Sequence, residues 1–316
     1  MAPTLVFLEH HSGELQKGSL GVLAKAASLG GEVAGVVLGA SEDVAAAAGG
    51  GTVYLCDDPA LEAPLPQPRV DAFEALVAQS GAETVLFAAS VLASDVAAGL
   101  AARLGAGLNW DLTDLRLEDG DLVGTRPALG DTIVAEVGWR GTPRIGLVRS
   151  GAFEAAETSG IAHVVPFAAT FQDFSALAQL VERTQEVSAG PSIEEAEVIV
   201  AGGRGLGRAE NFSLCEALAK ELGGAVAATR AVVDAGWYPY AAQVGQTGKS
   251  VSPRLYIACG ISGAIQHKVG MQGSGTIVAI NKDANAPIFD FADFGVVGDV
   301  EQVVPKLTDL VRARRS

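Results

Sequence analysis

The stretch Ala196-Glu-Val-Ile-Val-Ala-Gly-Gly-Arg-Gly-Leu-Gly207 decides the fold of the second half of the chain. Its apolar run, rich in branched residues, is typical of a strand that is buried on both faces of a parallel sheet. The glycines after it let the backbone come close to a ligand, and the helix-like segment Glu210–Leu222 that follows favours an anion at its start. A nucleotide-binding loop is one interpretation of this pattern, and a tight turn with an exposed Arg204 is the other.

The same alternation continues towards the carboxyl terminus. Strand-like runs occur at Gly224–Ala228, Leu255–Ala258 and Thr276–Ile280, and each leads into a loop with glycines or small polar residues. Ser262 can cap a helix that starts at Gly263. Because such loops meet at one edge of an α/β sheet, they predict a nucleotide cradle. The loops are Gly202–Gly207, Ala228–Arg230, Gln243–Ser250, Cys259–His267 and Asn281–Asp283.

Two common phosphate-binding motifs are incomplete in these loops. The dinucleotide pattern that begins at Gly203 has Arg208 in place of its third glycine, which argues against an NAD-dependent dehydrogenase. A phosphate-transfer loop ending in Gly248-Lys-Ser250 would need a glycine where Gln243 stands. The Gln243–Ser250 loop therefore offers a ligand the Thr247 hydroxyl, the Gln246 amide and backbone N–H groups.

The first half of the chain predicts another α/β domain. Strand-like runs alternate with amphipathic helix-like segments, which favours a mostly parallel sheet with helices on both faces. From about Leu112 short strand-like runs follow one another and predict an antiparallel extension. The parallel strands are expected at Leu5–Leu8, Glu32–Leu38, Thr52–Leu55 and Thr84–Ala88, the helices at Ser19–Ser28 and Asp71–Gln79, and the antiparallel strands at Leu115–Glu118, Leu122–Arg126, Thr132–Val137 and Arg144–Val148.

The division into domains follows from chain length and from one change in composition. At 316 residues the chain exceeds an average domain. Hydrophobic content falls around Thr184–Glu195, where Gly190-Pro191-Ser192 interrupts any regular element. We therefore predict two α/β domains, at residues 1–188 and 193–316.

Composition excludes several classes of function. A net charge of −15 argues against a nucleic-acid partner, because phosphate binding needs a basic surface. The apolar runs are too short or too interrupted for membrane insertion, and no basic leader precedes the first strand, so we expect a bacterial, cytoplasmic protein. With 3 widely spaced cysteines and only 4 histidines, neither a disulfide framework nor a metal site is expected. Cys56, Cys215 and Cys259 should be small buried side chains.

The stretch Gln243–Asp299 closely resembles the alpha subunit of electron-transfer flavoproteins, called FixB in nitrogen-fixation operons. The resemblance extends upstream through Thr229–Gly236 and Gly202–Arg204, and it fades in the first half. The segments that carry it are Val244-Gly-Gln-Thr-Gly248, Leu255-Tyr-Ile-Ala258, Gly260-Ile-Ser-Gly-Ala-Ile-Gln-His267, Thr276-Ile-Val-Ala-Ile-Asn-Lys-Asp283 and Ala286-Pro-Ile-Phe289.

The resemblance implies that the second domain is a doubly wound parallel α/β domain that binds FAD. Arg230 matches an arginine over the flavin ring, Thr247 a hydroxyl near N5, and His267 a group near the C2 carbonyl. Ser262 matches a phosphate contact, and Asn281 and Asp299 match the adenosine end. The full set that falls where the family contacts FAD is Arg204, Thr229, Arg230, Val244, Gly245, Gln246, Thr247, Ser262, Gly263, Ala264, Ile265, Gln266, His267, Asn281, Asp299 and Val300.

The resemblance also implies an electron carrier rather than an enzyme. The first domain would contact an obligatory beta subunit in a heterodimer, although Ala128-Leu-Gly-Asp131 departs from the family pattern at a partner contact. Electrons would come from flavoprotein dehydrogenases, such as the acyl-CoA dehydrogenases of fatty acid beta-oxidation, and pass singly to an electron-transfer flavoprotein quinone oxidoreductase. Arg230 and His267 would stabilise the negative charge that the flavin gains on reduction. The alternatives are an electron-bifurcating heterodimer that uses NADH, an NAD-dependent dehydrogenase, and a nucleotide-binding regulatory module.

Overall fold

The computed structural model describes residues 3–129, 132–155, 160–182, 192–194 and 196–315. Contacts within the chain divide it into two compact units, Met1–Gln185 (unit 1) and Glu186–Ser316 (unit 2). Both units are α/β, as predicted. Most of the expected linker, including Gly190 and Pro191, lies outside the described residues, as do Gly130 and Asp131 of the partner-contact segment. The predicted domain limits therefore stay predictions.

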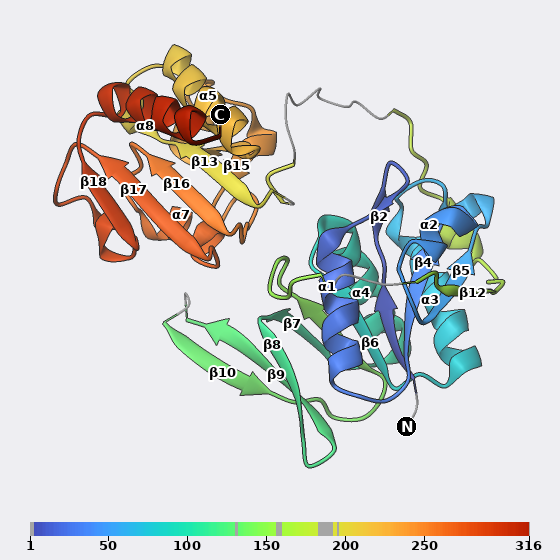
Figure 1. Cartoon of the computed structure of the whole chain (residues 1–316). Helices are drawn as coiled ribbons and strands as arrows, with labels where there is room; N and C mark the ends of the chain where they lie inside the picture. The colour runs from blue at the N-terminus through green and yellow to red at the C-terminus, as the bar shows by residue number, and fades with distance from the viewer. Residues whose placement is uncertain (1–2, 130–131, 156–159, 183–191, 195, 316) are drawn as a thin grey trace. The chain divides into compact units, whose positions relative to one another are not determined.

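Unit 1 is built on a parallel sheet (Figure 1). In its described residues the seven strands run in the order β12-β5-β4-β1-β6-β11-β7, and every neighbouring pair is parallel. The strands are β1 (Thr4–Phe7), β4 (Val33–Leu38), β5 (Thr52–Cys56), β6 (Thr84–Ala88), β7 (Leu108–Leu112), β11 (Arg144–Val148) and β12 (His163–Pro166). A small hairpin follows β1. Its two strands, β2 (His10–His11) and β3 (Glu14–Leu15), have two residues each.

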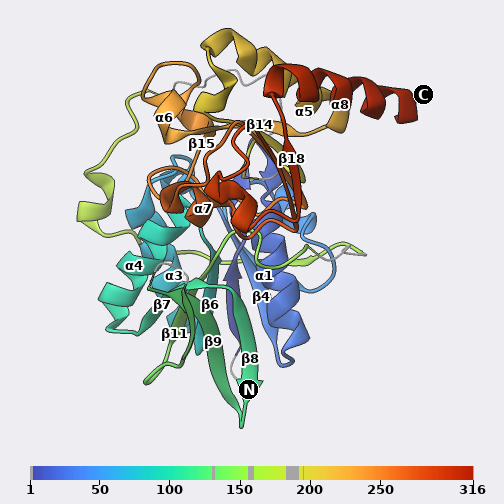
Figure 2. The same cartoon turned by 90° about the vertical axis from the view of Figure 1, so that its left-hand side faces the viewer.

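Helices cover both faces of this sheet, with α1 (Lys17–Ser28) on one side and α3 (Pro66–Ser80) and α4 (Val91–Leu104) on the other (Figure 2). The short helix α2 (Glu42–Ala46) belongs to the α1 side. Alternate residues of a strand point to opposite faces, so β1 contributes Val6 to the core beneath α1 and Phe7 to the core beneath α3 and α4. Burial on both faces explains why the inner strands β1 and β4 are apolar along almost their whole length.

The antiparallel extension is confirmed, but among the residues that the structure describes it contains one strand fewer than predicted. It consists of β8 (Asp114–Glu118), β9 (Asp121–Ala128) and β10 (Ile133–Val137), paired in the order β10-β9-β8. The prediction that Arg144–Val148 belongs to it is wrong, because β11 lies in the main sheet, parallel to β6 and β7. Ile145 and Val148 are fully buried there, which is the environment of a central parallel strand.

The described part of unit 2 contains a six-stranded parallel sheet in the order β15-β14-β13-β16-β17-β18. The chain builds outward from β13 to β15, then returns past β13 and builds the other side. This order is that of a doubly wound domain, as predicted, and it leaves a crevice at the carboxyl ends of β13 and β16. The strands are β13 (Val198–Gly202), β14 (Ala225–Thr229), β15 (Gln243–Val244), β16 (Leu255–Cys259), β17 (Thr276–Asn281) and β18 (Phe294–Val297).

Each face of the second sheet has its own core. One core, which includes Val200 and Ile257, lies beneath α5 (Phe212–Leu222), α6 (Arg230–Val233) and α8 (Val300–Arg315). The other includes Ile199 and Tyr256 and packs against α7 (Ile265–Met271) and a 3-10 turn at Pro287–Asp290. In Figure 1, α5 and α8 lie together on the same side of the sheet.

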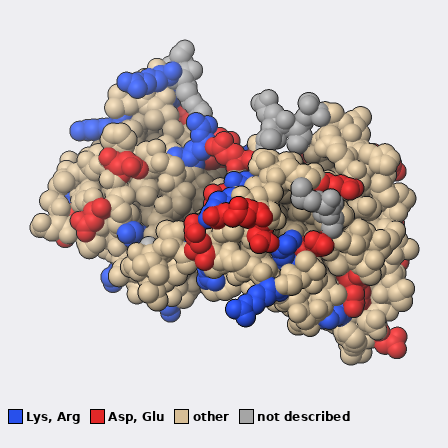
Figure 3. Space-filling model, turned by 90° about the horizontal axis from the view of Figure 1, so that it is seen from below, with Lys and Arg blue, Asp and Glu red and all other residues tan. Residues whose placement is uncertain are grey.

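The three cysteines agree with the prediction from the sequence. Cys56, Cys215 and Cys259 are buried and free, as predicted. No described helix is both long enough and apolar enough to cross a membrane. The described residues also contain no group of three or more His, Cys, Asp or Glu side chains placed to hold a metal ion. On the face shown in Figure 3, Lys and Arg side chains lie among Asp and Glu side chains.

Candidate cofactor site

Every site residue predicted from the sequence lies at the carboxyl edge of the unit 2 sheet. The six strands are parallel, so the loops that leave this edge come from all of them. Arg204 follows β13; Thr229 ends β14 and Arg230 begins α6; Val244 ends β15 and Gly245, Gln246 and Thr247 follow it; Ser262, Gly263, Ala264, Ile265, Gln266 and His267 follow β16; Asn281 ends β17; Asp299 and Val300 follow β18.

Glycines bring the loops after β13 and β16 into direct contact at the crevice. A Cβ atom on Gly205 would lie 2.6 Å from the Gly260 Cα, and one on Gly203 would lie 2.6 Å from the Gly260 carbonyl oxygen. The Gly205 N–H donates to that same oxygen over 2.9 Å. The packing of the two loops on each other therefore requires these glycines.

A pocket of about 120 Å³ opens beside this contact. It brings together three predicted residues, Asn281, Asp299 and Val300, which come from two different loops. The remaining lining residues are Gly205, Leu206, Gly207, Gly260, Lys282 and Glu301. Amide and carboxylate oxygens in such a pocket can accept hydrogen bonds from ribose hydroxyls or an adenine amine, and Lys282 adds a cation.

Internal hydrogen bonds hold the polar side chains of this pocket in place. The Asn281 amide donates to the Ile261 carbonyl over 2.9 Å, and its oxygen accepts from the Asp283 N–H over 3.0 Å. One oxygen of Asp299 accepts from the Glu301 N–H over 2.9 Å at the start of α8. Asn281 still has a second amide hydrogen and Asp299 a second oxygen, so each can also bind a ligand.

His267 is buried, with 6% of its surface exposed, and both of its ring nitrogens have protein partners. Nδ1 lies 3.0 Å from the Val244 carbonyl oxygen, and Nε2 lies 2.9 Å from the Tyr256 hydroxyl. A carbonyl can only accept, so Nδ1 carries the hydrogen and Nε2 accepts from Tyr256. His267 therefore connects α7 to β15 and to β16.

Burial also keeps the His267 ring uncharged. It lowers the pKa of the ring from 6.5 to about 4, against the opposing effect of the hydrogen bond to Val244. The ring is neutral at pH 7, so it offers no positive charge to the C2 carbonyl of a flavin. Its place beside the flavin stays a prediction.

The loop after β15 packs tightly on α7. Gly245 adopts a φ of +140°, which favours glycine, and a Cβ atom on Gly270 would lie 2.3 Å from the Gly245 nitrogen. The Gln246 N–H donates to the Gln266 carbonyl over 2.7 Å. The Gly245–Thr247 and Ser262–His267 segments are therefore held side by side.

The helix after β16 begins later than predicted. Ser262 does not cap it, because α7 starts at Ile265 and Ala264 occupies the cap position without a side-chain hydrogen bond. Gly263 has a φ of +87° and fits against Ile288, whose N–H donates to the Ser262 carbonyl over 3.0 Å. This turn delays the helix by two residues and leaves the Ser262 side chain exposed.

The predicted arginines lie at the surface of the same edge. Arg204 is exposed. The Arg230 side chain is 66% exposed, and its Nε lies 3.2 Å from an Asp234 oxygen one turn along α6. Neither arginine is held in a fixed position over the loops after β15 and β16. Both have room to reach a ligand.

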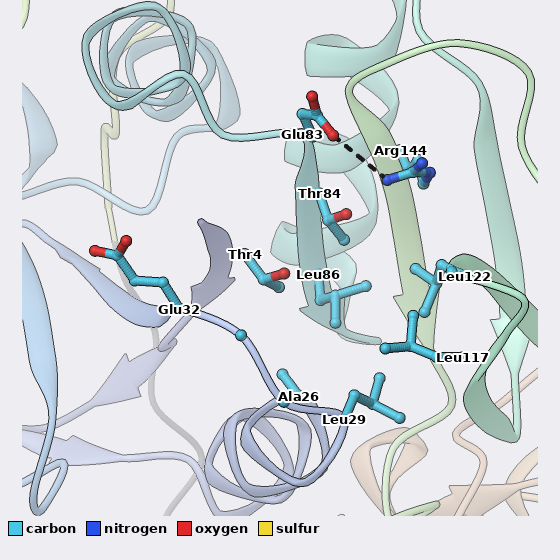
Figure 4. A pocket seen from close by; sticks show the side chains of 13 residues that line it. Thr4, Ala26, Leu29, Glu32, Glu83, Thr84, Leu86, Leu117, Leu122 and Arg144 are labelled. Carbon is cyan, nitrogen blue, oxygen red and sulfur yellow. Dashed lines mark ion pairs between the residues drawn. The ribbon is translucent and has the colours of Figure 1, made fainter. Parts of the chain in front are cut away.

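A second pocket, of about 250 Å³, lies in unit 1 (Figure 4). It is lined by the amino ends of strands, with Thr4 of β1, Thr84 of β6 and Arg144 of β11, and its charged side chains include an ion pair of 3.9 Å between Arg144 and Glu83. Ligands of open α/β sheets bind at the carboxyl ends. We therefore assign no cofactor to this pocket, although it is the larger one.

Sequence reasoning missed several residues of the site. Lys282 adjoins Asn281, so its place after a strand was a usable signal. No sequence signal pointed to Glu301, because it lines the pocket as part of the first turn of α8, a helix that was not predicted. Gln243 was considered only as the residue that breaks a phosphate motif, yet it is buried beneath the Gly245–Thr247 loop.

Comparison with known families identifies this architecture. The family model described as "Electron transfer flavoprotein domain" matches residues 4–171, and "Electron transfer flavoprotein FAD-binding domain" matches residues 192–272. The electron transfer flavoprotein subunit alpha of Mycobacterium leprae is 44% identical over 321 residues, with 100% of both chains covered. Protein FixB of Clostridium saccharobutylicum is 41% identical, with 96% of this chain and 94% of that protein covered. This chain belongs to the electron transfer flavoprotein alpha subunit family.

FAD is the cofactor of this family's second domain, and the residues present fit it. The glycine-lined pocket supplies carboxylate and amide groups suited to the adenosine end, with Lys282 beside it. The loops after β15 and β16, which are largely exposed, can contact the flavin end and the phosphates. The family therefore accounts for the concentration of polar loops at one edge of the second sheet.

Proposed function

We propose that this chain is the FAD-carrying alpha subunit of a heterodimeric electron transfer flavoprotein in the bacterial cytoplasm. It accepts electrons from flavoprotein dehydrogenases, such as those of fatty acid beta-oxidation, and passes them singly to an electron transfer flavoprotein quinone oxidoreductase. A beta subunit is its partner, and unit 1 provides the contact. The carboxyl-edge site in a doubly wound domain that matches the family's FAD-binding domain is the observation that supports this function.

Bound FAD would supply the capacity to store and release electrons, and the protein would supply binding and orientation. Asn281 and Asp299 would hold the adenosine end in the pocket beside Lys282. Exposed groups of the Ser262–Gln266 segment would bind the phosphates. Arg230 would place positive charge near the flavin ring, where it favours electron uptake.

The proposal is tested by expressing the chain together with a beta-type partner. The purified heterodimer should be yellow, with a flavin absorption spectrum, and denaturation should release one FAD per heterodimer. Two flavins per heterodimer would favour the bifurcating alternative. A colourless heterodimer that takes up no added FAD would overturn the proposal.

The electron donors are tested separately. An acyl-CoA dehydrogenase with its substrate should bleach the flavin absorption of the heterodimer under anaerobic conditions, and NADH alone should not. Direct bleaching by NADH would contradict the carrier function and favour bifurcation. Bleaching by neither donor would leave FAD binding intact but remove beta-oxidation from the proposal.

A further inference from the structure

Gln243 is a buried polar side chain beneath the Gly245–Thr247 loop, which we predict lies at the flavin. Only 2% of its surface is exposed. Its Nε2 lies 3.1 Å from the Thr247 carbonyl oxygen and 3.2 Å from the Thr247 Oγ1. One amide group therefore contacts both the main chain and the hydroxyl of the same residue.

The chemistry of these contacts fixes the direction of each hydrogen bond. The Thr247 carbonyl oxygen can only accept, so the amide atom that faces it must be the NH2 group of Gln243. A flipped amide would place its oxygen against this oxygen. The same NH2 group donates to Oγ1, which makes the Thr247 hydroxyl an acceptor on its inner side.

The hydroxyl hydrogen of Thr247 is thereby left for an outer partner. Within the described residues Thr247 Oγ1 has no acceptor to which it donates. Thr247 is exposed. A hydroxyl that accepts from inside the protein and is open on the outside presents its hydrogen to whatever binds on the loop.

The loop that carries Thr247 is held in one shape. The Lys249 N–H donates to the Gln243 carbonyl over 2.8 Å, and the Tyr240 hydroxyl donates to the Thr247 carbonyl over 3.2 Å. A Cβ atom on Gly248 would lie 2.4 Å from the Gln243 carbonyl oxygen, so the chain turns closely around that residue. Gln243 and Thr247 cannot move apart without opening the loop.

From this geometry we infer that Gln243 is a positioning residue that sets the Thr247 hydroxyl as a hydrogen-bond donor to the flavin. The inference rests on the proposed function, because it takes FAD as the ligand. Gln243 acts through Thr247 and does not itself contact the cofactor. A fixed donor stabilises the flavin most when electron uptake makes the flavin a stronger acceptor.

The test is a double-mutant cycle on the FAD-loaded heterodimer. Gln243→Met keeps the length of the side chain and removes its donor, and Thr247→Val removes the hydroxyl. Spectroelectrochemical titration should show that Gln243→Met weakens the preference for the reduced flavin about tenfold, which is about 59 mV for one electron. In the Thr247→Val background Gln243→Met should cause no further shift, because its effect passes through the missing hydroxyl.

A control separates this effect from general destabilisation. Thr308 is also buried, in α8, and its hydroxyl donates to the Val304 carbonyl over 2.9 Å. Thr308→Val removes a buried hydrogen bond away from the loop and should leave the potential unchanged. If Gln243→Met does not retain FAD, Gln243→Asn replaces it, because this variant stays polar and draws the amide back by one methylene.

The outcomes distinguish the inference from the proposed function. A parent heterodimer that retains no flavin overturns the function and the inference with it. A parent that holds FAD, with an unchanged potential in the Gln243 variant, overturns the inference alone. An equal shift in the parent and Thr247→Val backgrounds overturns the route through Thr247.

Discussion

His267 lies between a phenol and a backbone carbonyl, and this environment controls its charge. The ring binds no proton at neutral pH because burial lowers its pKa to about 4. In the unfolded chain the ring would titrate near 6.5. The unfolded state therefore takes up the proton first as the pH falls, so the stability from the neutral ring is complete above about 6.5 and is lost towards 4.

We expect His267→Gln to flatten the pH dependence of stability. Between pH 6.5 and 5 the parent heterodimer should lose about 1.5 kcal/mol more of its unfolding free energy than the variant, since each unit of pKa difference corresponds to about 1.4 kcal/mol. Urea unfolding followed by flavin fluorescence measures this difference. His163→Gln, at an exposed histidine, is the matched control. Parallel curves for the parent and His267→Gln would contradict the assignment.

Among single residues, the sequence indicated the candidate site but not the hydrogen bonds within it. Asn281 and Asp299 could be predicted because polar residues at the ends of parallel strands share one edge of the sheet. The hydrogen-bond partners of His267 could not be predicted, because Val244 and Tyr256 lie on two strands that are distant from α7 in the sequence. Whether a histidine in such a segment is exposed and charged or buried and neutral depends on those tertiary contacts.

The loops after β13 and β16 form one element of the site, and their contact depends on having no side chains. Gly205→Ala would place a methyl group within 2.6 Å of the Gly260 Cα. The loops must then separate, which costs about 1–3 kcal/mol and deforms the pocket. We expect FAD affinity to fall by roughly ten- to a hundredfold, measured by adding FAD to the deflavinated heterodimer.

Gly138→Ala is the control for this change. Gly138 has no atom within 4 Å of an added Cβ, and it lies in unit 1. Its affinity for FAD should match the parent. Equal affinities for all three proteins would show that the close approach of the two loops does not shape the pocket.

Strands buried on both faces were predicted to within a residue or two, whereas edge elements were missed. β6 was placed at Thr84–Ala88, as observed. The four residues of β18 are all exposed and lack a strand-like burial pattern, and β15 has only two residues. The helix α8 was not predicted, although Val300, Val304 and Thr308 recur at helical spacing and are buried.

At the scale of the whole molecule, both units use the same reversal of strand order. In unit 1 the chain also builds outward from its first strand, through β4 and β5, and then returns to β6 and β11. The order reverses between β1 and β6. Beyond the carboxyl ends of these two strands, Glu9 accepts a hydrogen bond of 2.5 Å from Ser90, which also caps α4. A carboxylate thus lies where an anionic ligand would bind, which agrees with the assignment of the cofactor to unit 2.

Because each unit has its own hydrophobic cores, a core substitution that destabilises one unit should not destabilise the other. In unit 1 the Phe73 ring packs edge-on against the Phe7 ring, with 5.6 Å between the ring centroids. The centroid of the Phe87 ring lies 5.2 Å from that of Phe73. Phe73→Ala should remove about 3–5 kcal/mol of stability there. Hydrogen exchange of the heterodimer should accelerate in β1 and β6 and stay unchanged in β13 and β16. Equal acceleration in both units would contradict the division into two domains.

Two hydrogen-bond chains at the cofactor edge, from His267 to Val244 and from Gln243 to Thr247, terminate on peptide oxygens. A peptide oxygen takes up no proton under conditions in which proteins stay folded, so it imposes an orientation without sensing acidity. We therefore expect the orientations of His267 and Gln243 to stay the same when the pH falls from neutral to mildly acid.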